Sequence, residues 1–456
     1  MSRVVLACCL VLVTSDAGEV LPDVSTRADS DQSYALYLPP GYTPDSPAPI
    51  LYCFEPRSRG VLCLELFRAA AERQGYIIAS SNNSRSDGPM EPNIAAMKAM
   101  WKDTQERLAI DDTRVYATGF SGGARVANIM GQVLGLAGVI AVGGGYPPSS
   151  PPRRDIPFDF FALVGEHDFN YYELRRLDRT LDELSLPHRI DVFPGRHQWA
   201  PADRCATALE WMELRAMRRE LRPVDPDQVG RWWREWNAEA AALEASGKLL
   251  RAERRYRSLV RDFDGLLDVS AATAAIARLA GDKDLKRQYK EHDRWDAWGQ
   301  AYLDRLAEVL TRLREPGRPT PGADQLMRDL EIDSLLKSAE EETDEEKGRA
   351  ARRVLEMVRV QTAVTQVQHY FSIEDYARAA VCLEVATRIT PSDKVAWYNL
   401  ACAQAQNGAT KKALRSLTRA VDEGFANVDQ LRDDPDLDPL RDRPEFAKLA
   451  DSLTPG

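Results

Sequence analysis

The chain has 456 residues, enough for two or three domains, and 44% of them are apolar, as in globular rather than disordered proteins. Its formal net charge of −10 argues against a surface for nucleic acid. After the N-terminal segment, no apolar run in the sequence is long enough to span a bilayer. We expect no metal site either, because no Cys or His spacing fits zinc.

Residues 1–17 have the pattern of a secretory signal peptide. A basic residue precedes an apolar run, and the small residues Ser15 and Ala17 stand at the cleavage positions. We therefore expect a periplasmic or secreted protein. Cys8 and Cys9 leave a lipid anchor open, and the alternative interpretation of the apolar run is an N-terminal strand.

Strand-like and helix-like segments alternate between residues 33 and 220. Such alternation is typical of a mostly parallel sheet with helices on both faces, so the expected fold class of this part is α/β. The expected strands span residues 49–54, 75–80, 114–118, 139–145, 158–164 and 188–193, and the expected helices span residues 64–71, 94–108, 124–130 and 132–136.

The strand at residues 114–118 leads directly into a G-x-S-x-G pattern, Gly119-Phe120-Ser121-Gly122-Gly123, and a helix-like segment follows. This is the context that a nucleophile elbow requires. Its glycines let strand and helix approach, and its serine hydroxyl is held out of the turn. The pattern predicts Ser121 as a nucleophile and the N–H of Gly122 as an oxyanion donor. The alternative is an ordinary strand–turn–helix.

A serine nucleophile needs a base, and His197 has the best position among the five histidines. It follows the last expected strand at the carboxyl edge of the sheet, where ligands bind. Asp168 follows the strand at 158–164 at the same edge and is the carboxylate expected to orient His197. Glu166 is the rival carboxylate, and Asp168 as a helix N-cap is the alternative interpretation. His188, at a strand start, is expected on the surface.

Further residues are candidates for substrate contacts. Asn82 and Asn83 follow the strand at 75–80 and could contact substrate oxygens, although turn chemistry is the favoured interpretation. Trp199 could form a wall of the acyl or alcohol pocket, or pack beneath the histidine loop. No long insertion follows the strand at 139–145, so we expect an open site without a large lid.

These residues resemble the α/β-hydrolase superfamily, with the closest similarity to the polyhydroxybutyrate depolymerase and feruloyl esterase-like group. The resemblance covers residues 33–220. It implies an esterase in which Ser121 attacks an ester carbonyl, His197 takes the proton and Asp168 orients His197. It also implies a small-molecule or polymer-linked ester as substrate and no cofactor. The motifs that carry the similarity are Tyr37-Leu38-Pro39-Pro40-Gly41-Tyr42, residues 111–124 and His197-Gln198-Trp199.

One turn departs from the group's pattern. The strand at 49–54 is usually followed there by His-Gly, which supplies the second oxyanion N–H, but here Glu55 and Pro56 follow. Because proline has no N–H, the backbone of Glu55 or Arg57 would have to donate. A carboxylate beside an oxyanion is unfavourable unless it turns away or pairs with Arg57 or Arg59.

This departure motivates an alternative function. The chain could be a scaffold or interaction protein that carries a degenerate, weakly active or inactive hydrolase domain. A serine peptidase is a second alternative, since it differs from an esterase only in the leaving group.

Beyond residue 221 the sequence has no further strand-like segments, and its pattern has the period of a helix. The expected organisation is a signal peptide at 1–17, a catalytic domain at 18–221, a helical region at 222–313, a linker and helix at 314–345 and a repeat region at 346–456.

The C-terminal part resembles tetratricopeptide repeats. Three buried-type residues recur with a period of 413 − 379 = 34, the length of one such repeat. Residues 236–259 fit one degenerate earlier unit. The resemblance implies a surface for a peptide or protein partner, and the alternative is a helical appendage that stabilises the chain or mediates self-association. The recurring residues are Ala379, Leu383 and Ala386, then Ala413, Leu417 and Ala420.

Five of the seven cysteines lie beyond residues 1–17, so at least one of them is unpaired. A bridge from Cys63 to Cys53 or to Cys205 remains open. Cys382 and Cys402 are expected as small core residues.

Overall fold

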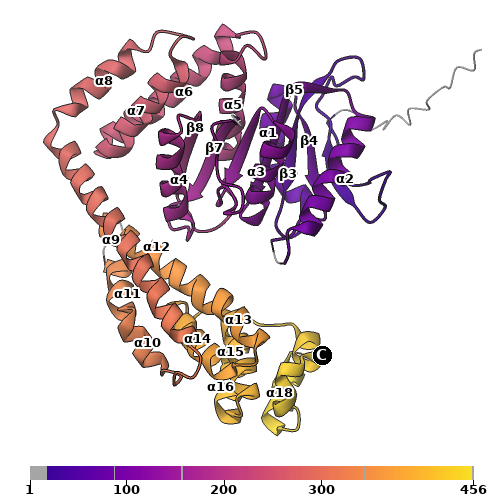
Figure 1. Cartoon of the computed structure of the whole chain (residues 1–456), viewed down its shortest axis with the longest axis vertical. Coiled ribbons are helices and arrows are strands. Elements are labelled where there is room, and N and C mark those ends of the chain that lie inside the picture. Colours follow the sequence, from indigo (N-terminus) through magenta and orange to yellow (C-terminus); the bar gives the residue numbers. More distant parts are fainter. Residues whose placement is uncertain (1–17, 87, 156–157, 342–344, 454–456) are drawn as a thin grey trace, which may run out of the picture. The chain divides into compact units, whose positions relative to one another are not determined.

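A computed structural model of the chain describes residues 18–86, 88–155, 158–341 and 345–453 (Figure 1). The expected signal peptide, residues 1–17, lies outside these ranges. The chain forms two compact units, one up to Tyr289 and one from Lys290 onward. Among the described residues, no helix is both long enough and apolar enough to cross a bilayer.

A single sheet forms the centre of the first unit, and within the described residues it has eight strands in the order β1-β2-β4-β3-β5-β6-β7-β8. Strand β2 is antiparallel to both of its neighbours, and all other pairs are parallel. The strands are β1 (Val20–Ser25), β2 (Ser33–Tyr37), β3 (Ala48–Phe54), β4 (Ile77–Ser81), β5 (Ile110–Phe120), β6 (Gly138–Val142), β7 (Asp159–Gly165) and β8 (His188–Phe193).

Helices cover both faces of this sheet. Helices α1 and α5 pack on each other and on one face, whereas α2, α3 and α4 pack on the other (Figure 1). The predicted α/β fold class is therefore confirmed by a mostly parallel sheet that helices cover on both faces. The helices are α1 (Gly60–Gln74), α2 (Glu91–Arg107), α3 (Gly122–Leu134), α4 (Tyr171–Glu183) and α5 (Ala202–Arg218).

The order of the strands places a switch point next to β3. The chain moves from β3 to β4 on one side, and then to β5 on the other side. Ligands of open α/β sheets bind outside the carboxyl ends of the strands at such a point. A ligand site is therefore expected at the carboxyl ends of β3, β4 and β5.

The next three helices complete the core of the first unit. Trp232 and Trp236 are buried in one continuous apolar cluster with Phe161 and Trp211 of the sheet domain. The guanidinium of Arg189, on β8, lies 5.2 Å from the ring centroid of Phe161 and 4.9 Å from that of Trp236. These helices are α6 (Pro226–Ala245), α7 (Leu249–Phe263) and α8 (Ser270–Ala280).

The change from strands to helices near residue 221 is thus not the division between the two compact units. That division falls between Tyr289 and Lys290, inside the 32-residue helix α9 (Lys283–Arg314). Residues 222–289 share a core with the predicted catalytic domain, because their large apolar side chains cover its helices and sheet.

The second unit is helical. Helices α14, α15 and α16 pack against one another in chain order. All six recurring alanine and leucine residues of the predicted repeat are fully buried on α14 and α16. The small side chains let neighbouring helices approach closely. The helices are α10 (Ala323–Asp329), α11 (Ile332–Glu341), α12 (Glu346–Val360), α13 (Gln366–Ser372), α14 (Tyr376–Ile389), α15 (Lys394–Gln406), α16 (Thr410–Asp422), α17 (Val428–Asp433) and α18 (Pro444–Ser452).

The cysteines of the described residues are free thiols. Cys53, Cys63 and Cys205 are buried in the first unit, and neither of the two bridges left open by the sequence is formed. Burial raises the pKa of the Cys63 thiol well above its usual value, so that thiol stays protonated. Cys382 and Cys402 are buried in the second unit, as expected for small core residues.

Candidate functional site

Ser121 stands at the turn between β5 and α3. Its backbone is strained, because φ is 54° and ψ is −116°, a region that residues with a side chain rarely adopt. The turn is held by a hydrogen bond of 2.8 Å from the Ser121 N–H to the carbonyl of Val142, at the end of β6. Strand, strained serine and helix follow one another as in a nucleophile elbow.

Close approach of the backbone explains the glycines of the elbow. A Cβ on Gly119 would lie 2.3 Å from the backbone of Gly123, and a Cβ on Gly123 would lie 2.0 Å from the carbonyl oxygen of Phe54. Real Cβ atoms do not come so close to backbone atoms. The spacing of the G-x-S-x-G pattern is therefore imposed by the packing of α3 against β5 and β3.

The structure brings Ser121, His197 and Asp168 together. Nε2 of His197 lies 2.9 Å from Oγ of Ser121. Nδ1 of the same ring lies 2.9 and 3.0 Å from the two carboxylate oxygens of Asp168. Asp168 is fully buried and also accepts a 2.8 Å hydrogen bond from the N–H of Asn170. A carboxylate on Nδ1 keeps the proton there, which leaves the lone pair of Nε2 facing the serine hydroxyl.

Two loops at the carboxyl edge hold the imidazole in place. The β7–α4 loop is joined to the β8–α5 loop by hydrogen bonds of 2.8 Å from Glu166 N to Phe193 O and from His167 N to Gly195 O. The His197 ring also contacts the rings of Phe120 and Phe169, with centroid distances of 4.6 and 4.1 Å.

Glu166, the rival carboxylate, is paired elsewhere. Its side chain forms an ion pair with Arg251 on α7, whereas both oxygens of Asp168 lie at the imidazole. Asp168 is also not the N-cap of α4, because that position is occupied by Asn170. Phe169, which packs on the imidazole, was not anticipated from the sequence, although it adjoins Asp168.

The turn after β3 is organised by the buried carboxylate of Glu55. It accepts hydrogen bonds from the backbone N–H of Arg57 at 2.7 Å and of Arg59 at 3.1 Å, and from the Arg59 guanidinium at 2.5 Å. Burial alone would raise the pKa of Glu55, but these hydrogen bonds and the charge of Arg59 lower it below its ordinary value. The carboxylate is therefore charged and bound within its own turn.

The same turn limits which backbone N–H can face an oxyanion. Pro56 has none. The N–H groups of Arg57 and Arg59 are bound to the Glu55 carboxylate, and that of Ser58 lies 3.0 Å from the carbonyl of Ser84. Among residues 55–59, the N–H of Glu55 is left as the candidate donor.

Ser86 lies next to the elbow and was missed by sequence reasoning. A Cβ on Gly122 would lie 2.3 Å from Oγ of Ser86, so this hydroxyl is beside the α-carbon whose N–H begins α3. The Ser86 N–H donates to the carbonyl of Pro56 at 2.9 Å, which ties this residue to the Glu55 turn. The available signal was the polar loop after β4, in which Ser86 follows Arg85.

Asn82 lies at the hairpin of β1 and β2. Its amide nitrogen donates to the carbonyl of Pro22 at 3.1 Å, to Ser33 Oγ at 3.2 Å and to a carboxylate oxygen of Asp23 at 3.3 Å. These bonds fasten the loop after β4 to the hairpin, and the structure does not bring Asn82 into the Ser121–His197 group.

Trp199 is half-buried, and its ring centroid is 5.6 Å from that of Phe120, which itself contacts the imidazole of His197. This is packing beside the histidine loop. The expectation of a surface position for His188 is wrong. Its ring is buried, with Nδ1 2.8 Å from the carbonyl of Leu186 and Nε2 3.2 Å from Asp178.

No family model and no curated protein matches the chain. Similar solved structures include FphF, a fluorophosphonate-binding serine hydrolase of Staphylococcus aureus, at 12% identity and a TM-score of 0.36, over 43% of this chain and 98% of that one. A feruloyl esterase module of Clostridium thermocellum is similar at 14% identity and a TM-score of 0.33, over 42% and 87% of the two chains. Est1E of Butyrivibrio proteoclasticus is similar at 12% identity and a TM-score of 0.33, over 43% of this chain and 99% of that one.

Proposed function

We propose that the protein is a serine hydrolase that cleaves carboxylic esters through an acyl-enzyme. The observation that carries this proposal is the continuous set of hydrogen bonds from Asp168 through His197 to Ser121. The serine hydroxyl is within reach of an imidazole that can take its proton, and a buried carboxylate orients that imidazole and stabilises its charged form.

The reaction follows from these positions. Oγ of Ser121 attacks the ester carbonyl carbon while Nε2 of His197 takes the hydroxyl proton. The tetrahedral intermediate collapses, and the imidazolium gives its proton to the departing alcohol, which leaves an acyl-serine. A water molecule, deprotonated by His197, then attacks the acyl-serine and releases the acid.

The negative oxygen of the intermediate needs hydrogen-bond donors. The N–H of Gly122, at the N-terminus of α3, is the first donor in our proposal, and the helix dipole favours negative charge there. The N–H of Glu55 and the hydroxyl of Ser86 are the candidates for the second. Because Arg59 and two backbone N–H groups bind the Glu55 carboxylate, its charge is offset within the turn.

The substrate class and location are part of the proposal. The resemblance to polyhydroxybutyrate depolymerases and feruloyl esterases favours a small or polymer-linked ester. The signal-like residues 1–17 favour a secreted or periplasmic protein. No step of this mechanism calls for a metal or an organic cofactor.

For the second unit we propose a tetratricopeptide-like surface for a peptide or protein partner. The proposal is supported by the 34-residue recurrence and by the burial of its small residues between packed helices. A purely stabilising appendage is the alternative.

The test is hydrolysis of 4-nitrophenyl acetate, 4-nitrophenyl butyrate and methyl ferulate by the full chain and by Ser121→Ala. Ser185→Ala is a matched control, because Ser185 also has a positive φ, of 56°, and is exposed at the end of α4. We expect Ser121→Ala to lose about 10⁴-fold or more in kcat and the control to keep it.

Well-folded wild-type protein without esterase activity would favour the scaffold alternative. Faster turnover of matched anilides than of esters would favour a peptidase.

A further inference from the structure

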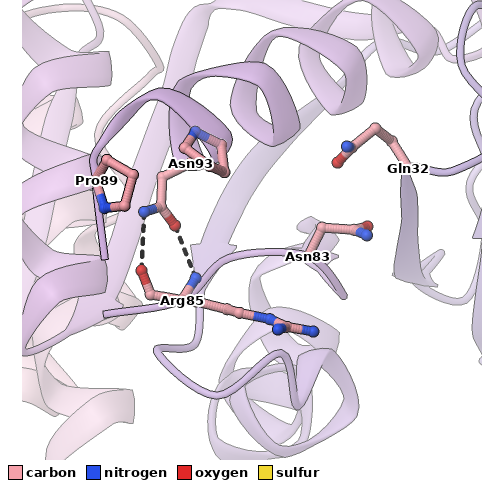
Figure 2. A pocket seen from close by; sticks show the side chains of 6 residues that line it. Gln32, Asn83, Arg85, Pro89 and Asn93 are labelled. Atoms are coloured by element: carbon pink, nitrogen blue, oxygen red, sulfur yellow. Dashed lines mark hydrogen bonds between the residues drawn. The ribbon is translucent and has the colours of Figure 1, made fainter. Parts of the chain in front are cut away.

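A cavity of about 350 Å³ lies beside the loop that follows β4 (Figure 2). Its walls come from three places: the turn between β1 and β2, the loop after β4, and the first turn of α2. The lining residues are Gln32, Asn83, Arg85, Pro89, Pro92 and Asn93.

Two of the polar lining residues serve the framework of this cavity. Oδ1 of Asn93 accepts from the N–H of Arg85 at 2.7 Å, and its Nδ2 donates to the carbonyl of Arg85 at 2.8 Å (Figure 2). Asn83 accepts from the N–H of Ser33 at 2.8 Å and donates to the carbonyl of Asp31 at 2.9 Å. In both amides the oxygen already accepts a hydrogen bond and the nitrogen already donates one. Asn83 and Asn93 therefore hold the walls of the cavity in place rather than bind a ligand.

The side chains of Arg85 and Gln32 have hydrogen-bonding groups that are left for a ligand. The guanidinium of Arg85 donates from Nε to Oγ of Ser58 at 3.2 Å, and no carboxylate of the described residues forms an ion pair with it. Oε1 of Gln32 is buried and has no hydrogen-bond partner in the described part of the chain. A guanidinium presents a planar fork of N–H donors that matches a carboxylate, and the Gln32 oxygen can accept from a hydroxyl or N–H of the same ligand.

The backbone of Arg85 is held before any ligand arrives. Besides the two bonds to Asn93, Arg85 forms an antiparallel bridge with Arg57 of the Glu55 turn. The position from which the guanidinium reaches into the cavity is thus fixed from two sides, which reduces the ordering cost of binding.

The cavity also has a defined place relative to Ser121. Ser86 directly follows Arg85, so their Cα atoms are about 3.8 Å apart. The hydroxyl of Ser86 lies beside Gly122. In the sheet, β2 and β4 lie on one side of β5. Strands β7 and β8, which are followed by the loops that hold Asp168 and His197, lie on the other side. Because His197 gives its proton to the departing alcohol, the alcohol oxygen lies at the imidazole on the β8 side, and the β4 side is open to the acyl group.

We propose that this cavity binds the far end of the substrate's acyl group, and that this end carries a carboxylate that Arg85 anchors. This inference rests on the proposed function of Ser121. It narrows the substrate from carboxylic esters in general to monoesters of dicarboxylic acids, or to esters of similarly acidic acyl groups.

The experiment compares two esters with the same leaving group and the same acyl length, 4-nitrophenyl pentanoate and mono-4-nitrophenyl glutarate. The quantity measured is the ratio of kcat/KM for the acidic ester to that for the neutral ester. In Arg85→Gln this ratio should fall at least tenfold, mainly through KM of the acidic ester, because the charge-assisted bond is lost. Arg231→Gln, an exposed arginine of α6, is the control and should keep the wild-type ratio.

A second measurement does not depend on hydrolysis. Calorimetric titration of the full chain with glutarate should give a dissociation constant that rises at least tenfold in Arg85→Gln and stays at the wild-type value in Arg231→Gln. If the neutral ester is hydrolysed but the ratio is the same in Arg85→Gln, the inference about the cavity is overturned and the esterase proposal stands. If no ester is hydrolysed, the esterase proposal fails. Glutarate binding that depends on Arg85 then supports the cavity alone, and binding that is absent or independent of Arg85 overturns it.

Discussion

Replacing Glu55 with alanine is expected to destabilise the first unit and loosen the turn beside the elbow. The carboxylate is fully buried and accepts two backbone hydrogen bonds and one from a guanidinium. A hydrogen bond to a charged group contributes about 1.5–3 kcal/mol. The Arg59 side chain is 51% exposed, so its ion pair contributes at most about 1 kcal/mol. Arg57 and Arg59 are exposed, so water can replace part of the hydrogen bonding of their N–H groups. We therefore expect Glu55→Ala to lower the free energy of unfolding by about 3 kcal/mol.

Glu55→Gln is the matched variant, because glutamine keeps the shape of the side chain and one acceptor oxygen. It should lower the free energy of unfolding by about half as much as Glu55→Ala.

The pH dependence of this stabilisation has a definite sign. The pKa of Glu55 in the folded protein lies below its ordinary value of 4.5, so the charge of Glu55 stabilises the fold fully above about pH 4.5. This contribution is lost as the pH falls through the lower folded pKa. The stability difference between wild type and Glu55→Gln should therefore shrink in acid.

Urea denaturation followed by tryptophan fluorescence, at pH 7 and at pH 4, measures these free energies of unfolding. Hydrolysis of 4-nitrophenyl acetate by the same samples reports on the elbow, and kcat should fall in Glu55→Ala. An alanine variant with the wild-type denaturation midpoint and the wild-type kcat would refute the assignment of Glu55 as the residue that organises this turn.

Three further substitutions test other contacts. Asp168→Asn should fold normally but lower kcat for 4-nitrophenyl acetate by about 10⁴-fold, since an amide favours the wrong imidazole tautomer; a loss below tenfold would argue against its role. Trp236→Ala should cost about 3–5 kcal/mol and lower the midpoint of the whole first unit, because Trp236 is 4% exposed in a shared core; a sheet domain that unfolds at its wild-type midpoint would contradict this. Ser86→Ala should lower kcat about 10²-fold with little change in KM if its hydroxyl binds the oxyanion; wild-type kcat would leave the Glu55 N–H as the second donor.

Local patterns in the sequence were sufficient to predict the parallel strands of the sheet and the elbow. Strands β3, β6 and β7 are mostly apolar and buried throughout, because both faces of a parallel sheet are covered. The elbow could be predicted because Gly119 is required by a backbone contact with Gly123, four residues further along the chain, whereas Gly123 is required by a contact with the distant Phe54. Strand β1 was not predicted, since it is an edge strand with exposed residues and no apolar run.

The remaining differences come from contacts between distant segments. His188 is buried because α4 covers it and Asp178 accepts its ring N–H, and neither fact is visible at the start of a strand. The packing of Trp236 against Arg189 likewise joins residues 47 positions apart (236 − 189), so the change from strands to helices near residue 221 gives no sign that residues 222–289 share the core of the sheet. Ser86 approaches Gly122 only through the fold.

The proposed esterase activity requires that Ser121 is a nucleophile that His197 activates. The most direct measurement is covalent labelling of the folded full chain with a fluorophosphonate, followed by mass spectrometry of its peptides. We predict one adduct, on Ser121, that is absent in Ser121→Ala and forms about 10³-fold more slowly in His197→Ala. Folded wild-type protein that remains unlabelled, or that is labelled at a different serine, would contradict the account.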